Sequence, residues 1–250
     1  MSLALLLKII GIEIGVMNGA IDPAKEQDML DKLVADMTTG FKTCVTSEDM
    51  MKEIMMGAKD QRKFYFLGAG PSYSLALCGA AKFMEQSAAD GIPQQLEEYG
   101  HEQYWVNNRR LESATIISIC PDGKSVQRCS ENLDEQNFLE MNTVLLTTSP
   151  VNKVFADKAK YTIATDGPLS ENDYWMAAGH LVARMANFYT DYINFSDKRF
   201  LSGEQFVEHY RTIHYSRFLP EVAKFDIEIP DDKTIGERGA YGLEFEKKKK

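Results

Sequence analysis

Lys82 and Glu85 are the residues of this chain whose types and spacing most directly suggest chemistry. They stand three residues apart in a segment of small and apolar residues, so on a helix they share one face. A carboxylate there can take a proton from carbon, while the ammonium stabilises an oxygen that gains negative charge. The carboxylate suits this work best when burial raises its pKa toward neutrality. The pair therefore predicts a proton-transfer site.

A glycine turn comes before these two residues. The segment GAGPS at 68–72 follows the apolar run 64–67, and the pattern predicts a helix over 73–88. Glycines permit close backbone approach, and the free N–H groups of a helix N-terminus attract an anion. We expect the phosphate of a small molecule there, with Lys82 and Glu85 pointing into a pocket above the turn. A dinucleotide is not favoured, because Tyr73 stands where a third glycine would be.

The elements that must position these residues alternate along the chain. The hydrophobic pattern after residue 63 predicts strands over 64–67, 114–119, 143–148 and 160–164, helices over 73–88, 125–138 and 171–193, and mixed structure over 94–107. Such alternation is typical of a parallel sheet covered on both faces. We therefore expect an α/β fold: a three-layer αβα sandwich with a parallel, flavodoxin-like sheet of about five strands, preceded by helices.

Parallel sheets bind ligands beyond the carboxyl ends of their strands. Hydroxyls and glycines follow the first three of the strands named above, and we take the substrate-binding candidates from these loops: Gly70, Ser72, Tyr73, Ser118, Ser125 and Thr147. A structural explanation stays open for each loop, because Ser, Gly, Asp and Pro also serve turns and helix caps. Ser125 in particular can cap the helix that follows it.

Composition narrows the function classes. The 250 residues include 28 Lys and Arg against 37 Asp and Glu, and this net charge of -9 argues against nucleic acid as the main partner. The four cysteines have no C-x-x-C spacing, which indicates reduced thiols and a cytoplasmic location. The apolar start, 3–14, is interrupted by Lys8 and Glu13 and is shorter than the roughly 20 apolar residues of a membrane span. We expect a packed helix there and no membrane partner.

The stretch from 64 to about 200 resembles a sugar isomerase (SIS) domain. It is most similar to the second of the two SIS domains in the isomerase half of glucosamine-6-phosphate synthase and in fructosamine-6-phosphate deglycases. Three segments carry the resemblance: GAGPSY at 68–73, ALCGAAKFME at 76–85 and EEYGH at 97–101. In that family a Lys-x-x-Glu pair on the helix after the first turn includes the Glu that moves a proton between sugar carbons 1 and 2. The resemblance implies this role for Lys82 and Glu85.

Further site residues follow from the resemblance. The family places a histidine downstream that acts in sugar ring opening, often across a subunit boundary, and His101 stands at the matching place with Glu98 before it. Glu102-Gln103 replaces the family's Gly-Pro after this histidine. Lys198, in the segment 194–200, corresponds to a terminal catalytic lysine. The family's proton transfer needs no metal or redox cofactor, so none is implied.

The resemblance also implies a domain organisation. Residues 1–20 are interpreted as the last helix of a preceding SIS domain that is missing or truncated, 21–60 as a helical linker, 61–200 as the SIS domain and 201–250 as a C-terminal extension. In relatives the preceding domain supplies a Ser/Thr-rich phosphate loop. The corresponding segment here, 118–125, has lost part of that pattern.

Two functions remain open. The first is an enzyme, either a phosphosugar isomerase or a sugar-amine 6-phosphate deglycase, acting by proton transfer between carbons 1 and 2. The second is a non-catalytic sugar-phosphate-binding or regulatory SIS module, favoured by the missing first domain and the altered residues after His101. Because the apolar helix at 3–14 needs a partner surface, we expect a homodimer or a higher homo-oligomer.

Overall fold

The computed structural model describes residues 2–87, 89–103, 114–149, 153–155, 157–167 and 169–193. These residues belong to one unit that ends at Ile193. Lys198 and the predicted extension 201–250 lie outside the described residues.

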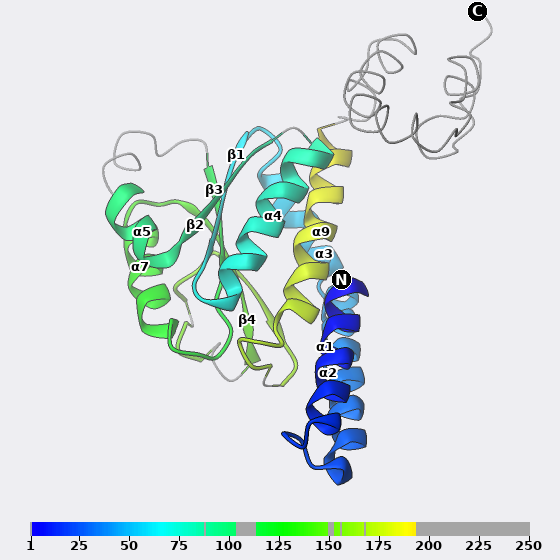
Figure 1. Cartoon of the computed structure of the whole chain (residues 1–250). Coiled ribbons are helices and arrows are strands. Elements are labelled where there is room, and N and C mark those ends of the chain that lie inside the picture. Colours follow the sequence, from blue (N-terminus) through cyan, green and yellow to red (C-terminus); the bar gives the residue numbers. More distant parts are fainter. Residues whose placement is uncertain are drawn as a thin grey trace, which may run out of the picture. The chain divides into compact units, whose positions relative to one another are not determined.

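A parallel sheet forms the centre of this unit (Figure 1), with strand order β2-β1-β3-β4-β5. Its strands are β1 (Lys63–Gly68), β2 (Asp90–Gln95), β3 (Ala114–Ile119), β4 (Asn142–Thr148) and β5 (Tyr161–Thr165). Helices α3 (Glu48–Gly57), α4 (Pro71–Ser87) and α9 (Trp175–Tyr192) cover one face, while α5 (Leu96–Glu98), the π-helix η2 (Tyr99–Gln103) and α7 (Val126–Phe138) cover the other. The predicted three-layer α/β fold with five parallel strands is confirmed.

The central strands are apolar on both sides because both faces are covered. All six residues of β3 are buried. Ile117 and Ile119 pack in the core beneath α4 and α9, whereas Ile116 packs in the second core beneath α7. In register, Ser118 lies beside Leu67 of β1 and Leu145 of β4, so the carboxyl ends of these three strands meet at one edge.

Strand β2 is the main departure from the sequence prediction, which placed mixed structure over 94–107 and assigned no strand to residues 90–93. Its sequence, DGIPQQ, has little β propensity. Pro93 lacks an N–H group, but β2 is an edge strand, where proline is tolerated. Gly91 lies against the backbone of Ala80 on α4, where any Cβ would overlap it. Packing against β1 and α4, rather than local propensity, therefore makes this strand.

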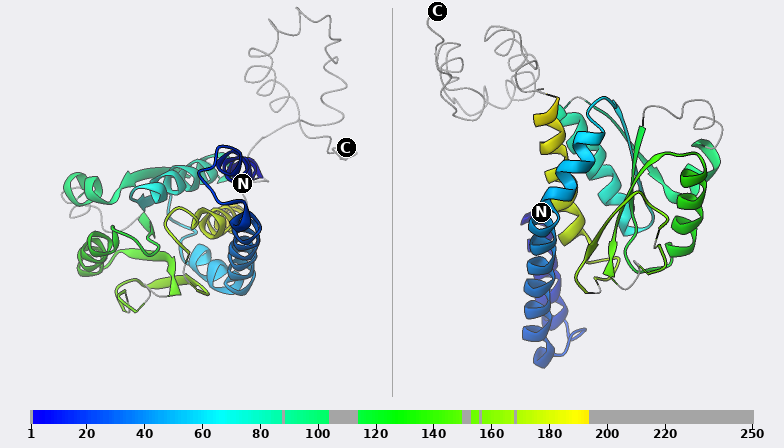
Figure 2. Two further views of the ribbon diagram at one scale, coloured as in Figure 1. Left: turned by 60° about the horizontal axis from the view of Figure 1, so that its bottom comes forward. Right: turned by 180° about the vertical axis from the view of Figure 1, so that it is seen from behind.

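Three further helical segments precede the sheet: α1 (Ser2–Met17), the short η1 (Pro23–Lys25) and α2 (Glu26–Thr46). The side chain of Asp22 caps the N-terminus of η1. Figure 2 shows α2 running beside α9, and Gly40 lies directly against the backbone of Met176 and Ala177. Helix α3 adds Met51, Ile54 and Met55 to the core. The segment interpreted as a linker thus contributes to the core, while the proposed domain boundaries stay predictions.

Helix α1 keeps much of its apolar surface exposed. Leu6, Leu7 and Ile14 each have about half of their surface accessible, whereas Ile12 is buried. An ion pair from Lys8 to Asp173 connects the helix to the turn that precedes α9. In the part of the chain that the structure describes, no helix has the length and apolar character needed to cross a membrane.

Candidate functional site

The carboxyl edge of the sheet is where the structure places the predicted substrate-binding residues other than Lys198. Gly70 follows β1 with φ +52°, a left-handed conformation that favours glycine. Ser72 and Tyr73 belong to the first turn of α4, and Ser118 and Thr147 lie near the ends of β3 and β4. Ser125 precedes α7. The topology therefore brings three glycine- and hydroxyl-bearing loops to one edge.

The hydroxyls at this edge have different surroundings. Thr147 Oγ1 is buried and donates to the Cys120 carbonyl oxygen at 2.6 Å, a structural contact. Ser125 stands at the N-cap of α7, but its side chain makes no capping hydrogen bond. Among the described residues, Ser72 Oγ, Ser118 Oγ and Thr148 Oγ1 are buried without a hydrogen-bond partner. Buried hydroxyls without a hydrogen-bond partner are uncommon in folded proteins. Here they make the carboxyl edge of the sheet polar, although the strands that lead to it are largely apolar.

The turn 170–174, between β5 and α9, covers this edge and contributes Glu171. The position of a Cβ on Gly70 would lie 3.3 Å from Glu171 Oε1, and one on Gly123 would lie 3.1 Å from Oε2. The Glu171 carboxylate thus packs against both glycine loops. The prediction from sequence missed this residue because it considered the loops after only three strands. The loop after the strand predicted over 160–164 reaches the same edge, and that was the available signal.

Lys82 and Glu85 lie elsewhere, on the outer face of α4. The Lys82 Nζ to Glu85 Oε2 distance is 2.6 Å, and the two side chains are 38% and 62% exposed. The hydrogen bond to Glu85 raises the pKa of Lys82. Glu85 is fourteen residues beyond Pro71, which at 1.5 Å per residue places it about 21 Å along the helix axis. The expectation that the pair points into a pocket above the glycine turn is therefore wrong, because the two side chains are exposed and lie well along the helix from that turn.

The surface around this pair is mixed in character. Leu77 is 46% exposed and Met84 is 50% exposed on α4, and Cys78 is exposed one turn before Lys82. The opposite side of the helix is buried, with Phe83 and Ala80 in the core. Helix α4 therefore carries exposed apolar side chains as well as the charged pair.

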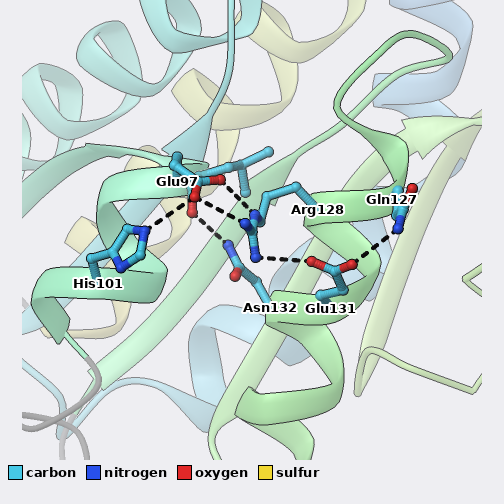
Figure 3. Close-up of polar contacts among 7 residues, drawn as sticks. Glu97, His101, Gln127, Arg128, Glu131 and Asn132 are labelled. Atoms are coloured by element: carbon cyan, nitrogen blue, oxygen red, sulfur yellow. Dashed lines mark hydrogen bonds and ion pairs between the residues drawn. The ribbon is translucent and has the colours of Figure 1, made fainter.

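His101 belongs to a surface cluster that Figure 3 shows. Its Nε2 lies 3.1 Å from Glu97 Oε1, and Glu97 accepts two hydrogen bonds from Arg128, at 2.6 and 2.9 Å. Arg128 also donates to Glu131 at 2.8 Å. The hydrogen bond from Arg128, with a smaller contribution from His101, lowers the pKa of Glu97. Glu98, the predicted catalytic residue before His101, is exposed, and its neighbour Glu97 is the residue that contacts the histidine.

Within this chain, His101 does not meet Lys82 and Glu85. Helix α4 covers one face of the sheet, and the α5–η2 segment packs on the other. The side chain of His101 is 72% exposed and points away from the core. The described residues therefore offer three separate places: the carboxyl edge, the α4 face and the His101 cluster.

Comparison with known proteins rests on structure alone, since no family model and no curated protein sequence matches this chain. The C-terminal domain of glucosamine-fructose-6-phosphate aminotransferase from Francisella tularensis superimposes with a TM-score of 0.63 and 17% identity, over 75% of this chain and 51% of that one. This chain thus spans about half the length of that domain.

Two further solved structures are similar. The Vibrio vulnificus NanR protein complexed with ManNAc-6P has a TM-score of 0.51 and 12% identity, with 70% of each chain covered. An Escherichia coli protein in complex with a sugar phosphate has a TM-score of 0.52 and 11% identity, over 76% of this chain and all of that one. At these identities the likeness establishes the fold.

Proposed function

Because the described chain has the fold of the sugar isomerase (SIS) domain, we propose that it acts on a phosphorylated sugar or sugar amine. The proposed reaction is a proton transfer between carbons 1 and 2, as in a phosphosugar isomerase or a sugar-amine 6-phosphate deglycase. The observation that carries this proposal is the Lys82–Glu85 ion pair on the outer face of α4. The sugar phosphates bound in two similar structures, one of them ManNAc-6P, support a ligand of this class.

In the proposed mechanism, Glu85 takes the proton from one carbon and returns it to its neighbour. The Lys82 ammonium, held in its charged form by the raised pKa, stabilises the negative oxygen of the enediolate between these steps. His101 donates a proton to the ring oxygen during ring opening. Glu98 stays a predicted member of the catalytic group. The edge residues Gly70, Ser72, Tyr73, Ser118, Ser125 and Thr147, together with Lys198, stay predicted substrate-binding residues.

The site we propose is completed by a second chain. His101 and the Lys82–Glu85 pair lie on different layers of one molecule, so a site that uses both must combine two molecules. A surface laid over Leu77 and Met84 would also shield Glu85 from water. A homodimer or higher homo-oligomer meets both needs.

The four free thiols support a reducing compartment such as the cytoplasm.

A second candidate function is a non-catalytic sugar-phosphate-binding or regulatory module. The exposure of Glu85 favours it, because a carboxylate that is 62% accessible and paired with Lys82 has the surroundings of a solvated surface ion pair. In this alternative the fold binds the ligand and no proton moves.

Solvent deuterium exchange separates the two candidates. The full chain is incubated in D₂O with fructose 6-phosphate, glucosamine 6-phosphate or a fructosamine 6-phosphate, and proton NMR follows the signals at carbons 1 and 2. Ligand-induced thermal stabilisation is measured in parallel, because binding raises the melting temperature by mass action. Glu85→Gln is the test variant. Asp28→Asn on α2 is a charge-matched control, since Asp28 is exposed and belongs to none of the candidate sites.

We expect exchange with one of these sugars in the wild type and in Asp28→Asn. In Glu85→Gln we expect exchange to fall by a factor of about 100 or more while the thermal stabilisation is kept. Stabilisation without exchange in the wild type would overturn the enzyme and support the binding module. If no phosphorylated sugar stabilises the chain, both candidate functions fail.

A further inference from the structure

We propose that Glu171 is a specificity-determining residue of the carboxyl edge, where its carboxylate occupies the place of an external anion and keeps phosphate away from the glycine turn. This role goes beyond the proposed function, whose proton transfer lies on the outer face of α4. It also runs against our own prediction that Gly70 and Ser72 bind a phosphate.

The Glu171 carboxylate lies between the loops that follow β1 and β3. Its two oxygens pack against Gly70 and Gly123, with 3.3 and 3.1 Å to the places where Cβ atoms on those residues would stand. Gly70 immediately precedes α4, and the N-terminus of that helix carries partial positive charge. One carboxylate therefore bridges the loops after β1 and β3, the space in which a phosphate on this edge would have to lie.

The turn that carries Glu171 is held in place. Asp122 and Ser170 form a parallel bridge between the two loops, and Ser170 Oγ donates to Asp173 Oδ2 at 2.7 Å. The backbone N–H groups of Asp173 and Tyr174 both donate to the Ser170 carbonyl oxygen at 2.9 Å. Tyr174 is fully buried, and its hydroxyl donates to the Thr147 carbonyl oxygen at 2.9 Å. The turn is thus anchored to the end of β4.

The charge balance of the edge also disfavours a bound phosphate. Among the described residues, no Lys, Arg or His forms an ion pair with Glu171. A dianionic phosphate placed beside it would meet the like charge of Glu171 at short range. Meanwhile Ser72 Oγ, in the first turn of α4, is buried without a hydrogen-bond partner in the described chain. The like charge of Glu171 therefore disfavours an anion at this edge.

Neutralising Glu171 should therefore open this edge to phosphate. The probe is inorganic phosphate, titrated at constant ionic strength and about pH 7.5 into the full chain, with amide NMR shifts of Gly70, Ser72 and Gly123 as the readout. Glu171→Gln removes the charge and keeps the size, whereas Glu171→Ala removes both. Asp28→Asn changes the net charge by the same amount at an exposed position on α2 and is the matched control. Thermal melting checks that each variant is folded.

For the wild type and Asp28→Asn, we expect no saturable shift at these three amides. Glu171→Gln should bind phosphate there at least about tenfold more tightly than the wild type, and Glu171→Ala at least as tightly as Glu171→Gln. Saturable binding at this edge in the wild type, or no gain in either folded variant, overturns the inference. Deuterium exchange on sugar phosphates is measured separately, so failure of the proposed function leaves this result interpretable.

Discussion

The carboxyl edge of the sheet and the outer face of α4 carry candidate site residues in opposite physical settings. At the edge, Ser118 and Thr147 are fully buried, and Tyr174 closes the end of β4 through a buried hydrogen bond. On α4, Lys82 and Glu85 stand in solvent and contact each other. The edge residues are constrained by packing, whereas the α4 pair is exposed to solvent and is expected to contribute little to the stability of the fold.

The two regions show that a sequence motif which suggests a functional site can be present either because the fold requires it or for another reason. A glycine turn between a strand and a helix is required by the fold itself, because backbone segments approach closely there. An exposed ion pair on a helix is not required by the fold, since such pairs add little stability. Changes at the tightly packed positions of the edge should therefore act mainly on stability, and changes at Lys82 and Glu85 should act on function. The following predictions test that division in order of decreasing effect.

Gly68→Ala should cause the largest loss of stability, about 3 kcal/mol in the free energy of unfolding. A Cβ on Gly68 would overlap the backbone of Ser72 and Tyr73, which cannot move without displacing the start of α4. Urea unfolding measures the loss. Gly57→Ala is the control, because nothing lies within 4 Å of the place of its Cβ. A Gly68→Ala variant as stable as this control would remove the claim that the edge is tightly packed.

Tyr174→Phe should lower the free energy of unfolding by about 1–2 kcal/mol. The substitution deletes the buried hydroxyl that donates to the Thr147 carbonyl oxygen at 2.9 Å and keeps the ring. Thermal and urea unfolding give the value, with Tyr73→Phe as a half-buried control. Equal effects of the two substitutions would mean that the turn 170–174 is not anchored by this hydrogen bond.

Glu97→Gln should have a smaller and pH-dependent effect. The pKa of Glu97 is lowered in the folded chain, chiefly by the hydrogen bond from Arg128, so its stabilising contribution is present above the unfolded value of roughly 4.3. The contribution is lost as the pH falls through the lower, folded pKa. The difference in urea midpoint between wild type and variant should therefore be larger at about pH 7 than near pH 3. A difference that grows on acidification would contradict this assignment.

Lys82→Ala and Glu85→Gln should change stability least, within about 0.5 kcal/mol each, because the pair is exposed to solvent. The same variants are predicted to abolish deuterium exchange on the sugar phosphate. Urea unfolding in low and high salt checks the first claim, since screening weakens surface pairs further. A loss above about 2 kcal/mol in the free energy of unfolding would mean that the pair stabilises the fold. The contrast between the α4 pair and the carboxyl edge would then not hold.

The elements of the central sheet could be predicted where apolar runs are strong. The range 114–119 predicted for β3 coincides with the observed strand, because every residue there is buried. Helix α9 starts at Trp175 rather than at 171, since the residues before it form the turn that covers the sheet edge. Strand β2 escaped prediction because DGIPQQ becomes a strand only when β1 and α4 hold it.

The candidate site was predictable in residue types and less so in arrangement. The three-residue spacing of Lys82 and Glu85 predicts that the two side chains share one helix face. In the structure they form an ion pair, as side chains at this spacing on one face can. Their distance from the glycine turn was misjudged, although the helical rise of about 1.5 Å per residue was enough to calculate it. For His101, the interacting carboxylate is Glu97, one residue before the predicted Glu98, because an i,i+4 spacing brings the two side chains together.

Neighbouring residues alone are enough to specify the α/β class, the alternation of strands and helices, and the pairing of Lys82 with Glu85. These features depend on hydrophobic period and on local helical geometry, which short stretches of sequence encode. Packing in three dimensions, by contrast, places Glu171 between Gly70 and Gly123, and puts His101 and Lys82 on different layers. Contacts between residues far apart in the chain depend on how strands and helices pack, and local patterns do not encode that packing.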